Sequence, residues 1–236
     1  MRRRVAGPIG RVVRGASWNA CAALGLALAL LALVPGRTAA QGIAGAGGAF
    51  NVQRRVSYQN HVYEQTGVLT GGSGELRLGF LRLGVRGLMG TLSGDGSALN
   101  PAVKLRTTAV TMEVALQPWM AIGATAEARR LESDAGIATW RLMGGLARIE
   151  PGLGVPGLRG VAEGVLLPSG TVSNGPKTKT AFQLTLGVSY QTPRGPFRAR
   201  IGYRFERYDF EATSNSPERY EQFRGVVAEA GIRLGR

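Results

Sequence analysis

The chain has 236 residues, a formal net charge of +14, 36 glycines, one cysteine and one histidine. A single cysteine excludes a disulfide framework, and one histidine without clustered acids leaves no metal-ligand spacing, so we expect no cofactor. The length fits one domain rather than two.

The chain begins with the three parts of a secretory signal. Arginines over residues 2–14 are followed by an apolar run over 22–34, and small residues at 38–40 offer a cleavage position. An apolar run of about 13 residues is shorter than the roughly 20 that a membrane helix needs. We therefore expect a signal peptide at 1–40 and a mature domain at 41–236, with an uncleaved N-terminal anchor as the alternative.

The mature chain remains basic. Residues 1–40 hold six arginines, Cys21 and no acids, so the remainder carries 23 basic and 15 acidic residues, a net charge of +8. The arginines stand singly at alternate positions with acids among them, and neither a basic helix nor an aromatic RNA-binding signature is present. We expect no nucleic-acid partner.

Taken in chain order, the mature chain consists of segments in which apolar and polar residues alternate. Successive side chains of a strand point to opposite faces, so this period predicts strands with one apolar and one polar face. The clearest segments have nine or ten residues, about the length that a tilted strand needs to cross a bilayer. The expected strands are 44–53, 67–80, 82–92, 105–117, 120–131, 137–149, 158–167, 182–191, 197–206 and 226–234.

Two places weaken the alternation. Apolar residues occupy even positions up to Phe80 and odd positions from Leu81 onward. A slip of one residue moves every side chain to the other face, so we expect a tight turn or bulge near Gly79–Arg82. The first segment, 44–53, is weak and precedes a polar stretch over 54–66, which leaves eight strands as the alternative to ten.

The segment 137–149 places an arginine among apolar residues. Trp140 and Leu142 share one phase of the alternation, and Arg141 shares the other with Met143. Because the apolar face is expected to meet lipid, we place Trp140 and Leu142 toward lipid and Arg141 in the lumen.

The connections between segments also alternate. Those after the second, fourth, sixth and eighth segments are tight or contain Pro and Gly, whereas those after the third, fifth, seventh and ninth are mostly longer and more polar. Transmembrane barrels have short turns at one rim and longer loops at the other. Ten strands would place both termini at the rim with the short turns.

The signal at 1–40, the period-two repeat over 41–236 and the alternating connections resemble small bacterial outer-membrane β-barrels, the broad class that includes OmpA-like proteins. The resemblance implies an all-β, antiparallel up-and-down transmembrane β-barrel in the cell outer membrane, in contact with outer-membrane lipid and inserted by the barrel-assembly machinery. Many such chains end on an aromatic residue used in assembly, whereas this one ends Leu234-Gly235-Arg236. A soluble lipocalin-like barrel, with its apolar face inward around a lipophilic ligand, is the competing interpretation.

If the apolar face meets lipid, the polar face lines the lumen. Side chains largely fill a barrel of eight to ten strands, and buried charges must be paired. We therefore expect a charge-paired, filled lumen and a structural or surface-recognition role with an undefined external ligand; a narrow anion-preferring pore is the alternative. The lumen-lining candidates are Arg82, Arg86, Glu113, Glu127, Arg129, Arg141, Glu163, Arg198, Arg200, Arg204, Glu206, Glu229 and Arg233.

Catalytic groups are few. His61 is the single histidine and lies near the expected outer rim, with Ser57 and Glu64 close in sequence. Histidine with an acid or serine could support a lipid- or peptide-hydrolysing enzyme, the second alternative. A lone histidine in a polar loop is more typical of a solvated side chain, and the glycine-rich segment 45–50 lacks the Lys-Ser/Thr ending of a phosphate loop. We expect no enzymatic activity.

Overall fold

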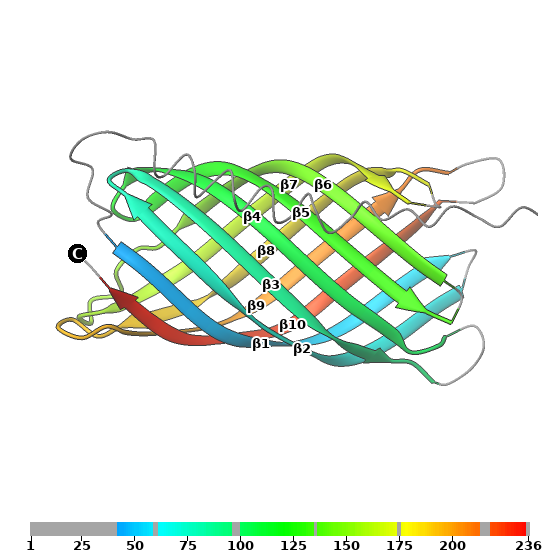
Figure 1. The fold of residues 1–236 in the computed structure, drawn as a ribbon, viewed down its shortest axis with the longest axis horizontal. Helices are drawn as coiled ribbons and strands as arrows, with labels where there is room; N and C mark the ends of the chain where they lie inside the picture. The colour runs from blue at the N-terminus through cyan, green and yellow to red at the C-terminus, as the bar shows by residue number, and fades with distance from the viewer. Residues whose placement is uncertain are drawn as a thin grey trace, which may run out of the picture. The chain divides into compact units, whose positions relative to one another are not determined.

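The computed structural model describes residues 42–58, 61–95, 100–134, 136–173, 176–212 and 218–234, which form a closed barrel of ten strands (Figure 1). Each strand pairs antiparallel with its neighbours in sequence, and β1 pairs with β10 to close the barrel. The predicted up-and-down barrel is confirmed, with ten strands. The strands are β1 (Gly42–Tyr58), β2 (His61–Leu78), β3 (Leu81–Ser93), β4 (Val103–Gln117), β5 (Met120–Ser133), β6 (Gly136–Ile149), β7 (Leu158–Val172), β8 (Thr178–Gln191), β9 (Phe197–Phe210) and β10 (Arg219–Leu234).

The predicted signal peptide at 1–40 lies outside the described residues. In the part of the chain that is described, no helix is long and apolar enough to cross a membrane.

The slip in the sequence pattern after Phe80 comes from a tight turn. Strand β2 ends at Leu78 and β3 begins at Leu81, with Gly79 at a φ of 62° between them. Glycine adopts this left-handed conformation without the steric cost that other residues have. By contrast, the polar stretch 54–66 was expected as a connection, and most of it lies in β1 and β2.

The barrel has two rims. The terminus rim contains the start of β1, the end of β10 and the connections 79–80, 118–119, 150–157 and 192–196. At the far rim β1, β3, β5, β7 and β9 end and β2, β4, β6, β8 and β10 begin. The expected alternation of length therefore holds only in part, because some strands continue further toward the far rim than their sequence pattern indicated.

The outer face of the barrel divides into two zones. On β9 the outward residues from Phe197 to Phe205 are apolar, and the next two outward residues are Arg207 and Asp209. We call the part toward the terminus rim the apolar zone and the part toward the far rim the polar zone. The same change lies between Ala49 and Asn51 on β1, Met89 and Thr91 on β3, Thr108 and Val110 on β4, Ala128 and Arg130 on β5, Arg141 and Met143 on β6, and Arg224 and Val226 on β10.

The heights of these zones match a barrel that crosses a bilayer and projects beyond it. The apolar series on β9 has eight steps of about 3.3 Å, which a tilt of about 40° reduces to a height of roughly 20 Å. Outer-membrane barrels have an apolar band of about 25 Å. The polar zone on β10, Arg219–Arg224, has five such steps and adds roughly 13 Å by the same arithmetic.

The inward-facing side chains also change between the two zones, in the opposite sense to the outer face. Where the outer face is polar, most inward side chains are apolar, as in a soluble barrel. Where the outer face is apolar, the inward side chains are mostly charged, polar or small. The buried apolar cluster consists of Phe50, Val52, Leu69, Leu92, Val103, Leu105, Leu131, Trp140, Leu142, Leu167, Ala181, Tyr208, Phe210, Phe223 and Val227.

This inversion corrects the prediction for β6. Trp140 and Leu142 are buried inside the barrel, with exposures of 0% and 1%, and Arg141 lies on the outer face. The sequence prediction assumed that apolar residues face lipid along the whole strand. Because Arg141 belongs to the polar zone, its outward side chain is solvated there, and the apolar side chains beside it point into the core.

Candidate functional site in the barrel interior

A buried polar network crosses the middle of the lumen. Arg129 on β5 donates to Glu206 on β9 at 2.5 Å and lies 3.0 Å from Glu127. Arg204 lies 2.5 Å from the other carboxylate oxygen of Glu206. Two arginines therefore face two glutamates, and all four side chains are at most 4% exposed. The charges of this cluster balance, as burial requires.

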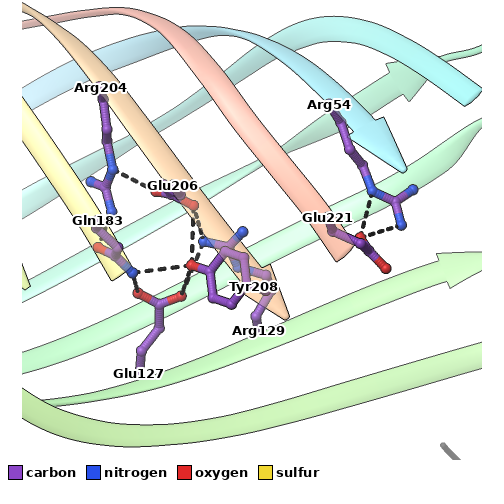
Figure 2. Close-up of polar contacts among 8 residues, drawn as sticks. All are labelled: Arg54, Glu127, Arg129, Gln183, Arg204, Glu206, Tyr208 and Glu221. Carbon is purple, nitrogen blue, oxygen red and sulfur yellow. Dashed lines mark hydrogen bonds and ion pairs between the residues drawn. The ribbon is translucent and has the colours of Figure 1, made fainter. Parts of the chain in front are cut away.

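Gln183 and Tyr208 complete this network (Figure 2). The Gln183 amide accepts a hydrogen bond from Arg204 at 2.8 Å and donates to Glu127 at 2.6 Å. The Tyr208 hydroxyl lies 3.1 Å from a carboxylate oxygen of both Glu127 and Glu206, and it can donate to one of them at a time. We call these six residues the central network. It joins β5, β8 and β9 across the lumen, so it holds opposite walls together.

Arginine and aromatic rings pack together on the far-rim side of this network. The Arg129 guanidinium lies 4.5 Å from the ring centre of Phe223 and 4.6 Å from that of Tyr208. Trp140 packs on Tyr208 and Phe210 with ring centres 5.2 and 5.1 Å apart. The cavity beside Arg129 and Phe223 has a volume of about 10 Å³, about the space that one water needs. Side chains therefore fill the lumen at this level.

Two further ion-pair groups lie on either side. Near the far rim, Arg54 donates to Glu221 at 2.6 and 2.9 Å (Figure 2). Arg54 also donates to Gln65 at 2.6 Å. Toward the terminus rim, Arg148 lies 2.9 Å from Glu113 and 3.1 Å from Glu163. The lumen is thus crossed by several layers of paired charge.

The structure places twelve of the thirteen lumen candidates on the inward face. Arg141 is the exception and lies outside. Arg82, Glu113, Glu127, Arg129, Glu163, Arg204 and Glu206 are buried, and Arg86, Arg198, Arg200, Glu229 and Arg233 are partly exposed. The central network unites Glu127, Arg129, Arg204 and Glu206, whereas Arg82, Arg198 and Arg233 lie at the terminus rim.

Several interior residues were not expected. Tyr208 could have been found, because it continues the alternate phase of Arg204 and Glu206. Arg148 could also have been found, but only if Leu142 had been read as inward. Arg54 and Glu221 gave no signal, because they are 167 residues apart and meet only when β1 pairs with β10.

His61, the candidate residue of the hydrolase alternative, is exposed at the start of β2. Its ring centre lies 6.3 Å from that of Tyr63, and its side chain makes no hydrogen bond or ion pair with another described residue. Within the described ranges, no three His, Cys, Asp or Glu side chains lie close enough to hold a metal ion.

Comparison with solved structures finds similar barrels. The outer membrane protease OmpT of Escherichia coli matches with a TM-score of 0.54 and 9% identity, covering 82% of this chain and 96% of that one. The translocator domain of the autotransporter NalP from Neisseria meningitidis gives a TM-score of 0.44 and 12% identity, covering 96% and 100%. Neisserial surface protein A gives a TM-score of 0.35 and 14% identity, covering 83% of this chain and 97% of that one.

At 9% identity the similarity to OmpT concerns the fold alone. No protein-family model and no curated protein sequence matches the chain. The structure therefore has the fold of a small outer-membrane β-barrel, the class that the sequence resembles.

Proposed function

We propose that this protein is an integral outer-membrane barrel with a sealed lumen and a structural or surface-recognition role. The observation that carries the proposal is the filled cross-section at the central network. There Arg129 and Glu127 on β5 bond to Glu206 and Tyr208 on β9, and the neighbouring cavity of about 10 Å³ is too small for a hydrated ion. Its expected lipid contact is the apolar zone, and its insertion is assigned to the barrel-assembly machinery.

The polar zone supports a role at the membrane surface. Its outward residues are mostly charged or polar and its interior is mostly apolar, which suits a segment surrounded by water. The start of β1 and the end of β10 at the terminus rim, together with the polar zone at the opposite rim, favour a periplasmic position for the terminus rim. The far rim then projects outward and presents its connections, where recognition would occur.

Conductance in a planar bilayer tests the sealed lumen. We expect the refolded mature protein to give no stable openings, because opening would require breaking buried ion pairs. The narrow anion-preferring pore makes the opposite prediction. Under that alternative, stable anion-selective openings occur, and Arg200→Glu lowers the selectivity. Such openings would overturn the proposal.

We further propose that the protein is not an enzyme. The protease OmpT shares the fold, but His61 is exposed and lacks a hydrogen-bonded acid among the described residues. General-base catalysis by histidine needs an oriented partner within hydrogen-bond reach. We therefore expect the parent protein and the His61→Ala variant to hydrolyse peptides and phospholipids at the same background rate. Turnover that disappears in His61→Ala would show a hydrolase.

A further inference from the structure

Arginines form a ring just inside the terminus rim. Five strands each place an inward arginine one residue from the strand end: Arg77 on β2, Arg82 on β3, Arg159 on β7, Arg198 on β9 and Arg233 on β10. All five line one open cavity with a volume of about 470 Å³. We call this cavity the arginine cup. Its volume lies within the range of roughly 300–1,000 Å³ that small-molecule sites occupy.

The positive charge of the cup is not neutralised by the protein. Arg77 pairs with Glu75, and Arg233 donates to Gln191 at 2.9 Å. The side chains of Arg82, Arg159 and Arg198, in contrast, make no hydrogen bond or ion pair with any described residue. Glu150 also lines the cup, so its walls keep a clear excess of positive charge.

Arg82 turns unused hydrogen-bond donors toward the cup. The residue is only 8% exposed and lines the cavity, yet none of its side-chain nitrogen atoms is among the buried atoms that lack a partner, so these donors are accessible from the cavity. An anion held in the cup would accept the hydrogen bonds that no described residue accepts from them.

The arginine cup opens at the terminus rim and is closed on its inner side by the ion pairs of the lumen. Arg200, on the cup wall, lies 3.6 Å from Glu163, and Arg148 pairs with Glu163 and Glu113 below it. A second cavity of about 80 Å³, which Arg198 and Arg200 also line, continues to Glu127 and Gln183 of the central network. At that network the remaining cavity shrinks to about 10 Å³. An anion entering from the terminus rim can therefore bind but cannot pass through.

We propose that the arginine cup binds a small, multiply charged anion bearing phosphate or carboxylate groups. Planar guanidinium groups match both groups through paired, charge-assisted hydrogen bonds. Three arginines without protein partners call for at least two negative charges on the ligand. The site is additional to the proposed surface role and does not depend on which way the barrel faces.

Calorimetric titration of the refolded protein in zwitterionic detergent with inorganic pyrophosphate tests the cup. We expect one site per barrel. The triple variant Arg82→Gln, Arg159→Gln, Arg198→Gln should weaken binding at least tenfold. A matched triple variant on the outer face, Arg106→Gln, Arg130→Gln, Arg141→Gln, removes the same charge and should change binding less than twofold.

A single variant and a second ligand complete the test. If the triple variant does not fold, the single variant Arg198→Gln at the partly exposed rim should still weaken binding about threefold. Dihexanoyl phosphatidic acid separates the ligand sources: tighter pyrophosphate indicates a soluble anion, and tighter phosphatidic acid indicates a lipid headgroup. Either outcome supports the cup. No binding at millimolar pyrophosphate, or equal loss in the outer-face variant, would overturn it.

Discussion

Replacing Glu206 by glutamine tests whether the central network holds the barrel together. Glu206 is 2% exposed and contacts Arg129 and Arg204, both at 2.5 Å. Removing one partner of a buried ion pair typically costs about 3–5 kcal/mol, because the other charge is left buried. Arg129 keeps Glu127 at 3.0 Å, whereas Arg204 loses its carboxylate partner. We therefore expect Glu206→Gln to lower the free energy of unfolding by about 3 kcal/mol, near the lower end of that range. This loss shifts the folding equilibrium roughly 150-fold.

The assay is reversible urea unfolding in lipid vesicles, followed by tryptophan fluorescence and by gel mobility of the folded barrel. The matched control is Glu132→Gln, which removes an outer-face pair with Arg130 at 3.4 Å whose side chains are 41% and 48% exposed. An exposed pair contributes at most about 1 kcal/mol.

A second variant separates unpaired charge from lost packing. Adding Arg204→Met to Glu206→Gln removes the stranded guanidinium, so part of the lost stability should return. Two outcomes would contradict a stabilising role for the central network: Glu206→Gln within about 1 kcal/mol of the parent, like the control, or a further loss of stability on adding Arg204→Met.

Two other substitutions test the lipid-facing wall and the buried aromatic residues beside the central network, and a third serves as the control for the wall. Ile201→Arg, at the middle of the apolar series on β9, should cost about 2–4 kcal/mol of folding free energy in vesicles. Thr66→Arg, outward in the polar zone between Gln53 and Ser93, should cost less than about 0.5 kcal/mol; equal losses would show that the zone boundary is misplaced. Phe223→Ala removes a ring that is 1% exposed and should cost about 3–5 kcal/mol by urea unfolding, and a loss below about 1 kcal/mol would show a loosely packed layer.

The strand pattern was readable because a strand turns its side chains to alternate faces regardless of its neighbours. The slip at Phe80 and Leu81 therefore indicated the turn at Gly79, and the alternation through Ile201 and Arg204 separated the wall from the lumen. These are properties of one strand with its own period.

The error at Arg141 has a different origin. The alternation shows which residues share a face, but not which face is inside. On β6, Trp140 and Leu142 are inward because their neighbours around the barrel lie in the polar zone. Only the position of a residue along the barrel axis decides between lipid and water outside, and that position comes from the register of ten paired strands.

The charge partners also depended on the closed barrel. Sequence predicted that the arginines and glutamates of the lumen would pair, because buried charge without a partner is costly. It could not predict that Arg129 would meet Glu206 across 77 residues, or Arg54 meet Glu221 across 167. Strand period is a local property of the chain, whereas pairing across a lumen depends on the closure and register of the whole sheet.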